Sequence, residues 1–188
     1  MKAHFPMSKV YMHGNNKLKR ELEFALDCGV GNIVVDSFAE ADILDELAGT
    51  RGVKQKVLIR INPGVEAHTH AFVQTARTDS KFGFSTSDGA AESIVKHVLS
   101  KQNIELRGFH CHIGSQIFEK QSFVLAAQKV MDFIANVRQK FDYQAKELNI
   151  GGGFGVWYND EDPQLKLSDY SDYLKALIQA VKQKAEEH

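Results

Sequence analysis

The sequence predicts an α/β fold with a parallel sheet, and three observations lead to this prediction. Short apolar runs alternate with helical patterns five times along the chain. Strands that alternate with helices pair in parallel, because each helix returns the chain to the same end of the sheet. The apolar runs contain few polar residues, as expected of strands that are covered on both faces.

The five strand–helix units have recognisable boundaries. The strands are expected at residues 9–14, 32–37, 56–64, 106–115 and 147–155. The helices are expected at residues 16–29, 38–49, 88–101, 120–141 and 168–187, where apolar side chains recur at helical spacing. Residues 65–87 form a connection that is too long for an ordinary strand-to-helix link, and such loops are usually functional or disordered.

Capping residues mark several of these boundaries. Gly29 is expected to end the first helix as a C-cap. Ser37 is expected to cap the second helix, with Glu40 completing a capping box. Pro63 stops the third strand, and Ser168 is a candidate N-cap for the last helix.

The residues leave two architectures open. Five units are too few to close an eight-stranded barrel. The chain is therefore either a complete doubly wound sheet or a piece of a (β/α)8 barrel. Its 188 residues, 43% of them hydrophobic, suffice for one globular domain or a large part of one.

Composition excludes several classes of function. A net charge of −1 gives no electrostatic reason to expect nucleic acid or an anionic membrane as a partner. No apolar run approaches the roughly 20 residues that span a bilayer, and residues 1–9 lack the apolar stretch of a signal peptide. Cys28 and Cys111 lie in apolar contexts, so we expect free buried thiols and a cytoplasmic location.

Polar residues and glycines follow every predicted strand, at the edge where ligands bind in both architectures. The last strand ends in Gly151, Gly152 and Gly153. These glycines form either a tight turn or a cradle in which backbone N–H groups approach a phosphate without interference from Cβ atoms. The GxGxxG pattern of dinucleotide sites is absent, so another phosphorylated ligand is favoured.

Three further residues each have two interpretations. Arg60 lies in an apolar strand, where it is costly unless it is paired with an acidic residue or with a ligand. Asn15 is either a turn residue or a pocket residue. Lys81 is either an ordinary surface lysine or a lysine of the site.

Two His-x-His pairs permit a metal-dependent alternative, His68 with His70 and His110 with His112. No acidic ligand is placed beside either pair, so no metal site is predicted. Strand positions two apart face the same side, so His110 and His112 are expected to point into one interior. A satisfied core histidine explains His110, but it explains His112 less well, because His112 lies at the strand exit.

Five ordered motifs closely resemble the diaminopimelate decarboxylases: MHGNNK, RINPGVEAHTH, TDSKFGF, GFHCHIGSQI and LNIGGGFG. These enzymes are barrel-type (fold III) pyridoxal-phosphate enzymes, related to ornithine decarboxylase and alanine racemase. The resemblance implies a partial (β/α)8 barrel of about five β/α units with parallel strands. It also implies pyridoxal 5′-phosphate as cofactor and a lyase of lysine biosynthesis that converts meso-2,6-diaminopimelate to L-lysine and CO₂.

The same resemblance implies roles for individual residues. His112 matches the catalytic histidine that stacks on the pyridine ring of the cofactor. The residues implied at the cofactor phosphate or beside it are Ser115, Gly151, Gly152, Gly153 and Arg60. Asn15 and Lys81 are expected at the substrate pocket, and no residue is expected to bind metal.

Some family features have no counterpart in the sequence. The Schiff-base lysine of the family lies upstream of HGNNK, and neither Lys9 nor Lys17 matches it. The Glu-Pro-Gly-Arg segment and the C-terminal β-domain are also unmatched. We therefore expect residues 1–188 to be a single segment of the cofactor-binding barrel domain, inactive alone, from a homodimeric parent enzyme that acts on a small amino acid. The alternatives are a decarboxylase of another basic amino acid, a non-catalytic cofactor carrier and a metal-dependent barrel hydrolase.

Overall fold

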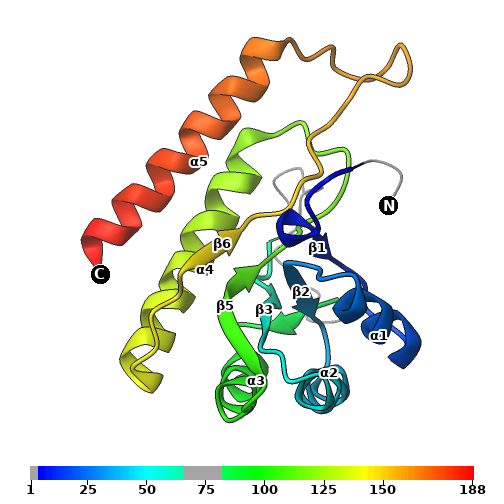
Figure 1. Ribbon diagram of the computed structural model, residues 1–188. Coiled ribbons are helices and arrows are strands. Elements are labelled where there is room, and N and C mark those ends of the chain that lie inside the picture. Colours follow the sequence, from blue (N-terminus) through cyan, green and yellow to red (C-terminus); the bar gives the residue numbers. More distant parts are fainter. Residues whose placement is uncertain (1–3, 66–81) are drawn as a thin grey trace. The chain divides into compact units, whose positions relative to one another are not determined.

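The computed structural model describes residues 4–65 and 82–188, which form two compact units. The first unit contains the described residues of Met1–Ile61, Lys81–His110 and Ala145–Leu148. The second contains those of Asn62–Ser80, Cys111–Gln144 and Asn149–His188. Figure 1 labels the helices of both units and the main strands. None of the helices described here is long and apolar enough to cross a membrane.

A parallel sheet forms the centre of the first unit. Its main strands are, in spatial order, β1 (Tyr11–Met12), β2 (Asn32–Val35), β3 (Gln55–Asn62), β5 (Ile104–His110) and β6 (Glu147–Asn149). The pairings of β1 with β2, of β2 with β3 and of β3 with β5 are parallel. The five predicted strands are thus confirmed. A sixth strand, β4 (Phe84–Ser85), pairs with β3, and its two residues are too few to show any periodicity in the sequence.

Helices alternate with the strands as predicted. The first unit contains α1 (Lys19–Asp27), α2 (Phe38–Thr50) and α3 (Ala90–Leu99), and these helices lie along one face of its sheet (Figure 1). The second unit contains α4 (Lys120–Phe141) and α5 (Leu167–Glu187). Every residue of β2 is buried, as expected of a central parallel strand.

The predicted caps are confirmed in part. Gly29 follows α1 with a φ of +69°, the left-handed conformation of a C-terminal glycine. The hydroxyl of Ser37 accepts a hydrogen bond from the N–H of Glu40 and so caps α2. The prediction for Ser168 is wrong. The carboxylate of Asp169 accepts the N–H of Lys166 at 2.7 Å, which places the N-cap of α5 at Lys166.

The sheet of the first unit is strongly curved. β1 and β6 stand four places apart in the strand order, which is about 19 Å along a flat sheet. The Tyr11 hydroxyl nevertheless donates a hydrogen bond to the Glu147 carboxylate. The rings of His13 and His110 meet edge to face with centroids 4.6 Å apart, although they belong to segments three strands apart. Such contacts occur inside a barrel, so the partial (β/α)8 barrel is confirmed and the open sheet is not.

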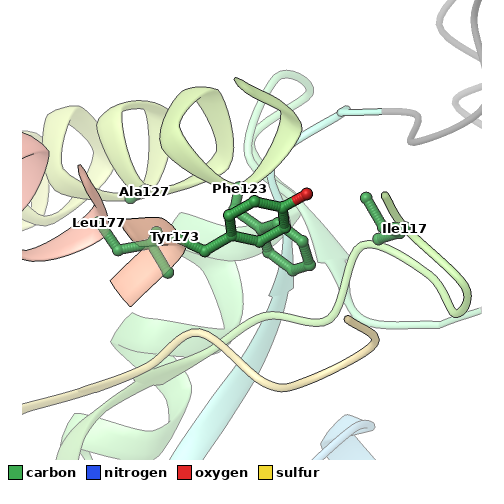
Figure 2. Packing of buried hydrophobic residues seen from close by; sticks show 5 residues of the cluster. All are labelled: Ile117, Phe123, Ala127, Tyr173 and Leu177. Atoms are coloured by element: carbon green, nitrogen blue, oxygen red, sulfur yellow. The ribbon is translucent and has the colours of Figure 1, made fainter. Parts of the chain in front are cut away.

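The second unit has a core of its own. α4 and α5 pack against each other, and the buried side chains in this core are Ile117, Phe123, Ala127, Tyr173 and Leu177 (Figure 2). The Tyr173 hydroxyl donates to the carbonyl of Phe118. The ring of Phe123 lies 4.5 Å from that of Phe154. The packing therefore anchors both Ile117 and Phe154, which flank the candidate site described below.

β5 and β6 approach each other closely at Gly108. A Cβ atom at this position would overlap the backbone carbonyl of Glu147 in β6. The two strands can pair at their present distance only because residue 108 has no side chain. The close pairing of β5 with β6 therefore depends on a glycine within β5.

We expect Gly108→Ala to lower the free energy of unfolding by about 3 kcal/mol, because the new methyl group must push the backbone of β6 away. Gly52→Ala is the matched control, since Gly52 has a φ of +63° and open space around its Cβ position. We expect that variant to cost only about 1 kcal/mol of left-handed backbone strain. Urea unfolding of the three proteins measures both values, and equal costs would contradict the proposed close approach.

Candidate functional site

Two segments of the second unit run side by side and frame the candidate site. One runs from Cys111 to Ile117, and the other runs from Asn149 to Gly155. The Cys111 N–H donates to the Asn149 carbonyl at 3.0 Å. Farther along, the Ile117 N–H donates to the Gly153 carbonyl and the Gly155 N–H donates to the Ile117 carbonyl, both at 2.9 Å. These bonds are those of a short parallel pair, with a bridge at Ile117.

Between these bonds the two segments separate into an arch (residues 112–116) and a glycine turn (residues 150–153). The side chain of Asn149 holds the turn, because its Oδ1 accepts the N–H of Gly151 at 2.9 Å. Gly151 and Gly153 have φ angles of +79° and +101°, which other residues rarely adopt. The backbone path of the turn therefore requires glycine at positions 151 and 153, whereas Gly152 is free of this constraint.

The glycine turn has the properties of an anion cradle. In the part of the chain that the structure describes, the N–H groups of Gly152 and Gly153 donate to no protein acceptor. A Cβ atom at Gly152 would meet nothing within 4 Å, so the space beside the turn is open. Successive N–H groups around such a turn bind anions through their partial positive charges.

The imidazole of His112 lies directly against the glycine turn. A Cβ atom on Gly151 would be 3.1 Å from His112 Nδ1, and one on Gly153 would be 3.2 Å from His112 Cε1. Both glycines therefore leave room for the ring as well as for the turn. His112 and Ser115 are both exposed on the arch, so a flat aromatic side chain and a hydroxyl stand beside the cradle.

The structure brings together five of the eight predicted site residues. His112, Ser115 and the triplet Gly151–Gly153 lie on the arch and the turn of the second unit. Arg60 and Asn15 belong to the first unit. Asn15 is exposed in a bend. Lys81 lies outside the described residues.

Arg60 is paired within the first unit. Its guanidinium lies 3.5 Å from the Asp36 carboxylate and 4.9 Å from the centre of the Phe82 ring. The other oxygen of Asp36 accepts the N–H of Gly83 at 2.8 Å. Burial raises the pKa of Asp36, and the hydrogen bond from Gly83 and the charge of Arg60 oppose that shift. This pairing satisfies Arg60 within the protein, and its contact with a cofactor stays a prediction.

The sequence reasoning missed a second ion pair of the first unit, which is buried. Lys17, in the HGNNK motif, lies 2.8 Å from Glu40, and both side chains are nearly inaccessible. The ammonium group also donates to the carbonyls of Gly14 at 2.6 Å and Val34 at 2.7 Å. It thereby ties the loop after β1 to the end of β2 and to α2. The available signal was a lysine after the first strand and a glutamate in the helix after the second strand, although the capping-box interpretation had assigned Glu40 to the N-terminus of that helix.

The histidines do not form a metal centre in the described part of the chain, where no group of three potential ligands gathers. His110 is buried against His13, whereas His112 is exposed beside the glycine turn. The two therefore have different surroundings, and the expectation of a shared interior is wrong, because the chain turns away from strand geometry after His110. His68 and His70 lie outside the described residues.

An apolar groove of about 430 Å³ lies beside the glycine turn in the second unit. Its walls come from the turn and from α5 and include Ile150, Phe154, Leu174, Leu177, Ile178 and Val181. Lys182 is the one charged residue of the lining, and the apolar side chains that form most of the walls offer no hydrogen-bond donors to a phosphate. We therefore assign the anion site to the backbone of the turn and not to the groove.

Comparison with known proteins identifies the family. The family model described as "Pyridoxal-dependent decarboxylase, pyridoxal binding domain" matches residues 1–188. The chain belongs to this family. Its membership confirms the resemblance seen in the five motifs and the predicted pyridoxal cofactor, and it does not support a metal-dependent hydrolase.

Several relatives of this pyridoxal-binding domain carry the same name, diaminopimelate decarboxylase. The diaminopimelate decarboxylase of Bacillus methanolicus is 44% identical over 180 residues, which are 96% of this chain and 41% of that protein. The solved diaminopimelate decarboxylase of M. jannaschii is 30% identical, with a TM-score of 0.82 over 95% of this chain and 41% of that one. That of Helicobacter pylori, in complex with L-lysine, is 28% identical with a TM-score of 0.79, over 96% and 44% of the two chains. The chain thus spans about two fifths of these proteins.

The buried pair in the pyridoxal-binding domain leads to a prediction about pH. Burial raises the pKa of Glu40 from 4.5 to about 7, against the opposing charge of Lys17. Between these two values the folded chain binds more protons than the unfolded chain does, so the contribution of Glu40 to stability falls as pH rises. We expect wild type to lose about 3 kcal/mol relative to Glu40→Gln between pH 4 and pH 8.

Urea unfolding of both proteins at pH 4, 6 and 8 measures this difference. Glu46→Gln is the control, because it removes one carboxyl group from an exposed position of the same helix. A constant difference between wild type and Glu40→Gln across this range would contradict the assignment.

Proposed function

We propose that this chain is the cofactor-binding part of an enzyme that decarboxylates meso-2,6-diaminopimelate to L-lysine and CO₂. The observation that carries the proposal is the glycine turn, with two N–H groups that have no protein acceptor in the described chain and an imidazole ring against it. The relatives that are 38–45% identical to this chain are diaminopimelate decarboxylases, which supports the choice of substrate.

The residues present suit pyridoxal 5′-phosphate. The N–H groups of Gly152 and Gly153 would bind the phosphate, and the exposed hydroxyl of Ser115 would add another donor. The ring of His112 would cover one face of the pyridine ring. Stacking of two flat rings contributes about 0.5–1.5 kcal/mol beyond the area that is buried. A cofactor held at its phosphate and on one ring face keeps a defined orientation.

The bound cofactor supplies an electron sink when the bond between the α-carbon and its carboxylate breaks and CO₂ leaves. The chain's own residues contribute binding and orientation. The backbone donors of the glycine turn do not titrate, so the protein's side of the phosphate contact would not change with pH. His112 would exclude water from the ring face that it covers and would so protect the reacting centre from solvent.

The predictions for two further site residues, for the oligomeric state and for the location remain proposals as well. Arg60 and Asn15 would act at the same cofactor and substrate, and the parent enzyme would be a homodimer with a small amino acid as its only other partner. The solved H. pylori relative binds L-lysine, the product of the proposed reaction. A cytoplasmic location also stays a prediction.

Binding of the cofactor tests the site. We expect the chain to bind pyridoxal 5′-phosphate, detected by its absorbance, and His112→Ala to weaken binding about tenfold through lost stacking. Gly152→Ala is expected to weaken binding by a similar factor, because its methyl group enters the open space of the cradle, without lowering the melting temperature. His188→Ala, at an exposed position at the end of α5, is the control. Unchanged affinity in both site variants would rule out the proposed cradle.

Turnover tests the substrate. We expect the protein that contains this chain, supplied with pyridoxal 5′-phosphate, to release CO₂ and L-lysine from meso-2,6-diaminopimelate. A panel with L-lysine and L-ornithine as substrates separates this reaction from decarboxylation of another basic amino acid. Turnover of only those two compounds would overturn the proposed substrate and leave the cofactor site intact.

A further inference from the structure

The arch and the glycine turn are joined by a side chain as well as by backbone. The carboxamide of Gln116 makes two hydrogen bonds with one residue beyond the turn. Its Oε1 accepts the N–H of Val156 at 3.0 Å, and its Nε2 donates to the carbonyl of Val156 at 2.9 Å. The side chain thus pairs with both backbone groups of one residue, as a residue of a neighbouring antiparallel strand would.

The backbone of Gln116 is in an unusual conformation. Its φ is +56°, one of three positive values among the non-glycine residues of the described chain. A glutamine gains nothing from this left-handed conformation, which glycine or asparagine adopts at lower cost. Strain of this kind persists only where the surroundings hold it, and the two side-chain bonds to Val156 and the backbone bonds of the adjacent Ile117 are contacts that hold Gln116.

The position of this pairing links the two halves of the cradle. Ser115 precedes Gln116 on the arch, and Ile117, which follows it, bonds to both Gly153 and Gly155. The Tyr170 hydroxyl donates to the Gly155 carbonyl at 2.8 Å, so the same stretch is also fixed from α5. Without the Gln116 pairing, the exposed end of the second segment would lose its tie to the arch at Val156.

We propose that Gln116 is a positioning residue that latches the glycine turn to the arch and sets the spacing of the phosphate donors. This inference rests on the proposed function, because it assigns Gln116 to the phosphate site of that function. The donors of the cradle come from both segments, so a change in the distance between the segments changes the fit to a phosphate directly. A ligand that has the ring without the phosphate uses only the contact with His112 and depends less on that distance.

Two variants separate the latch from backbone strain. Gln116→Met keeps the length of the side chain and adds no charge, but it removes both hydrogen bonds. Gln116→Gly also removes them and relieves the left-handed strain. Gln139→Ala, at an exposed position near the end of α4, is the control. Affinities are measured for pyridoxal 5′-phosphate and for pyridoxal, which has the ring without the phosphate.

We expect both variants to weaken binding of pyridoxal 5′-phosphate at least about fivefold, as the loss of two neutral hydrogen bonds implies, and to change binding of pyridoxal less than about twofold. Amide hydrogen exchange of the ligand-free protein gives a second measurement. We expect faster exchange at Ile117 and Gly155 and unchanged exchange at Phe133 in the middle of α4, which excludes general unfolding.

The outcomes distinguish the two proposals. Wild-type binding of pyridoxal as tight as that of pyridoxal 5′-phosphate would overturn the proposed phosphate site, and exchange at Ile117 and Gly155 would still decide whether the latch exists. A preference for the phosphate in wild type that both variants retain in full would overturn the latch. A gain of affinity in Gln116→Gly alone would show that strain, and not pairing, is the property that matters.

Discussion

The hydrogen bonds of Ile117 to Gly153 and Gly155 are the constraint on which the candidate site depends. They hold two segments in parallel contact at one end, while the bond from Cys111 to Asn149 holds them at the other. Five residues of one segment and three of the other must fit between these bonds, so both segments bow away from the strand geometry. The bowed stretches expose backbone donors that a regular sheet would have used. Side-chain packing under Ile117 keeps the ends in place.

In the first unit, polar side chains lie inside a curved sheet and contact one another there. Tyr11 with Glu147, and His13 with His110, meet across its interior. The Glu147 carboxylate accepts the hydrogen bond of the partly buried Tyr11 hydroxyl, and the ring of His13 packs against the buried ring of His110. Lys17 and Glu40 pair in the same way as charged groups, at the cost of a raised pKa for the carboxyl group. Curvature and polar pairing therefore depend on each other, since only a closed-in sheet brings such distant strands together.

The alternation of apolar runs and helical patterns predicted the strands and helices well, because their periods extend over many residues. Curvature could not be predicted from the residues alone. The contact of Tyr11 with Glu147 joins positions far apart in the chain, and the glycine that permits the close approach, Gly108, resembles an ordinary strand residue in the sequence. At the site, the three glycines and His112 were visible as motifs. The role of Gln116 was not, because a glutamine carries no sequence signal for pairing with a backbone 40 residues away.

The imidazole of His112 lies close to the cradle. A ligand that contacts both must therefore carry its ring close to its phosphate. The ring of His112 is in contact range of the Cβ positions of Gly151 and Gly153, so ring and cradle are neighbours on the scale of a few ångströms. In a nucleotide, a ribose separates the phosphate from the base, and the base would lie well away from such a neighbour. In pyridoxal 5′-phosphate, only a methylene group and an oxygen atom separate the pyridine ring from the phosphorus atom. A phosphate in this cradle therefore brings the pyridine ring, and not a distant base, next to the imidazole.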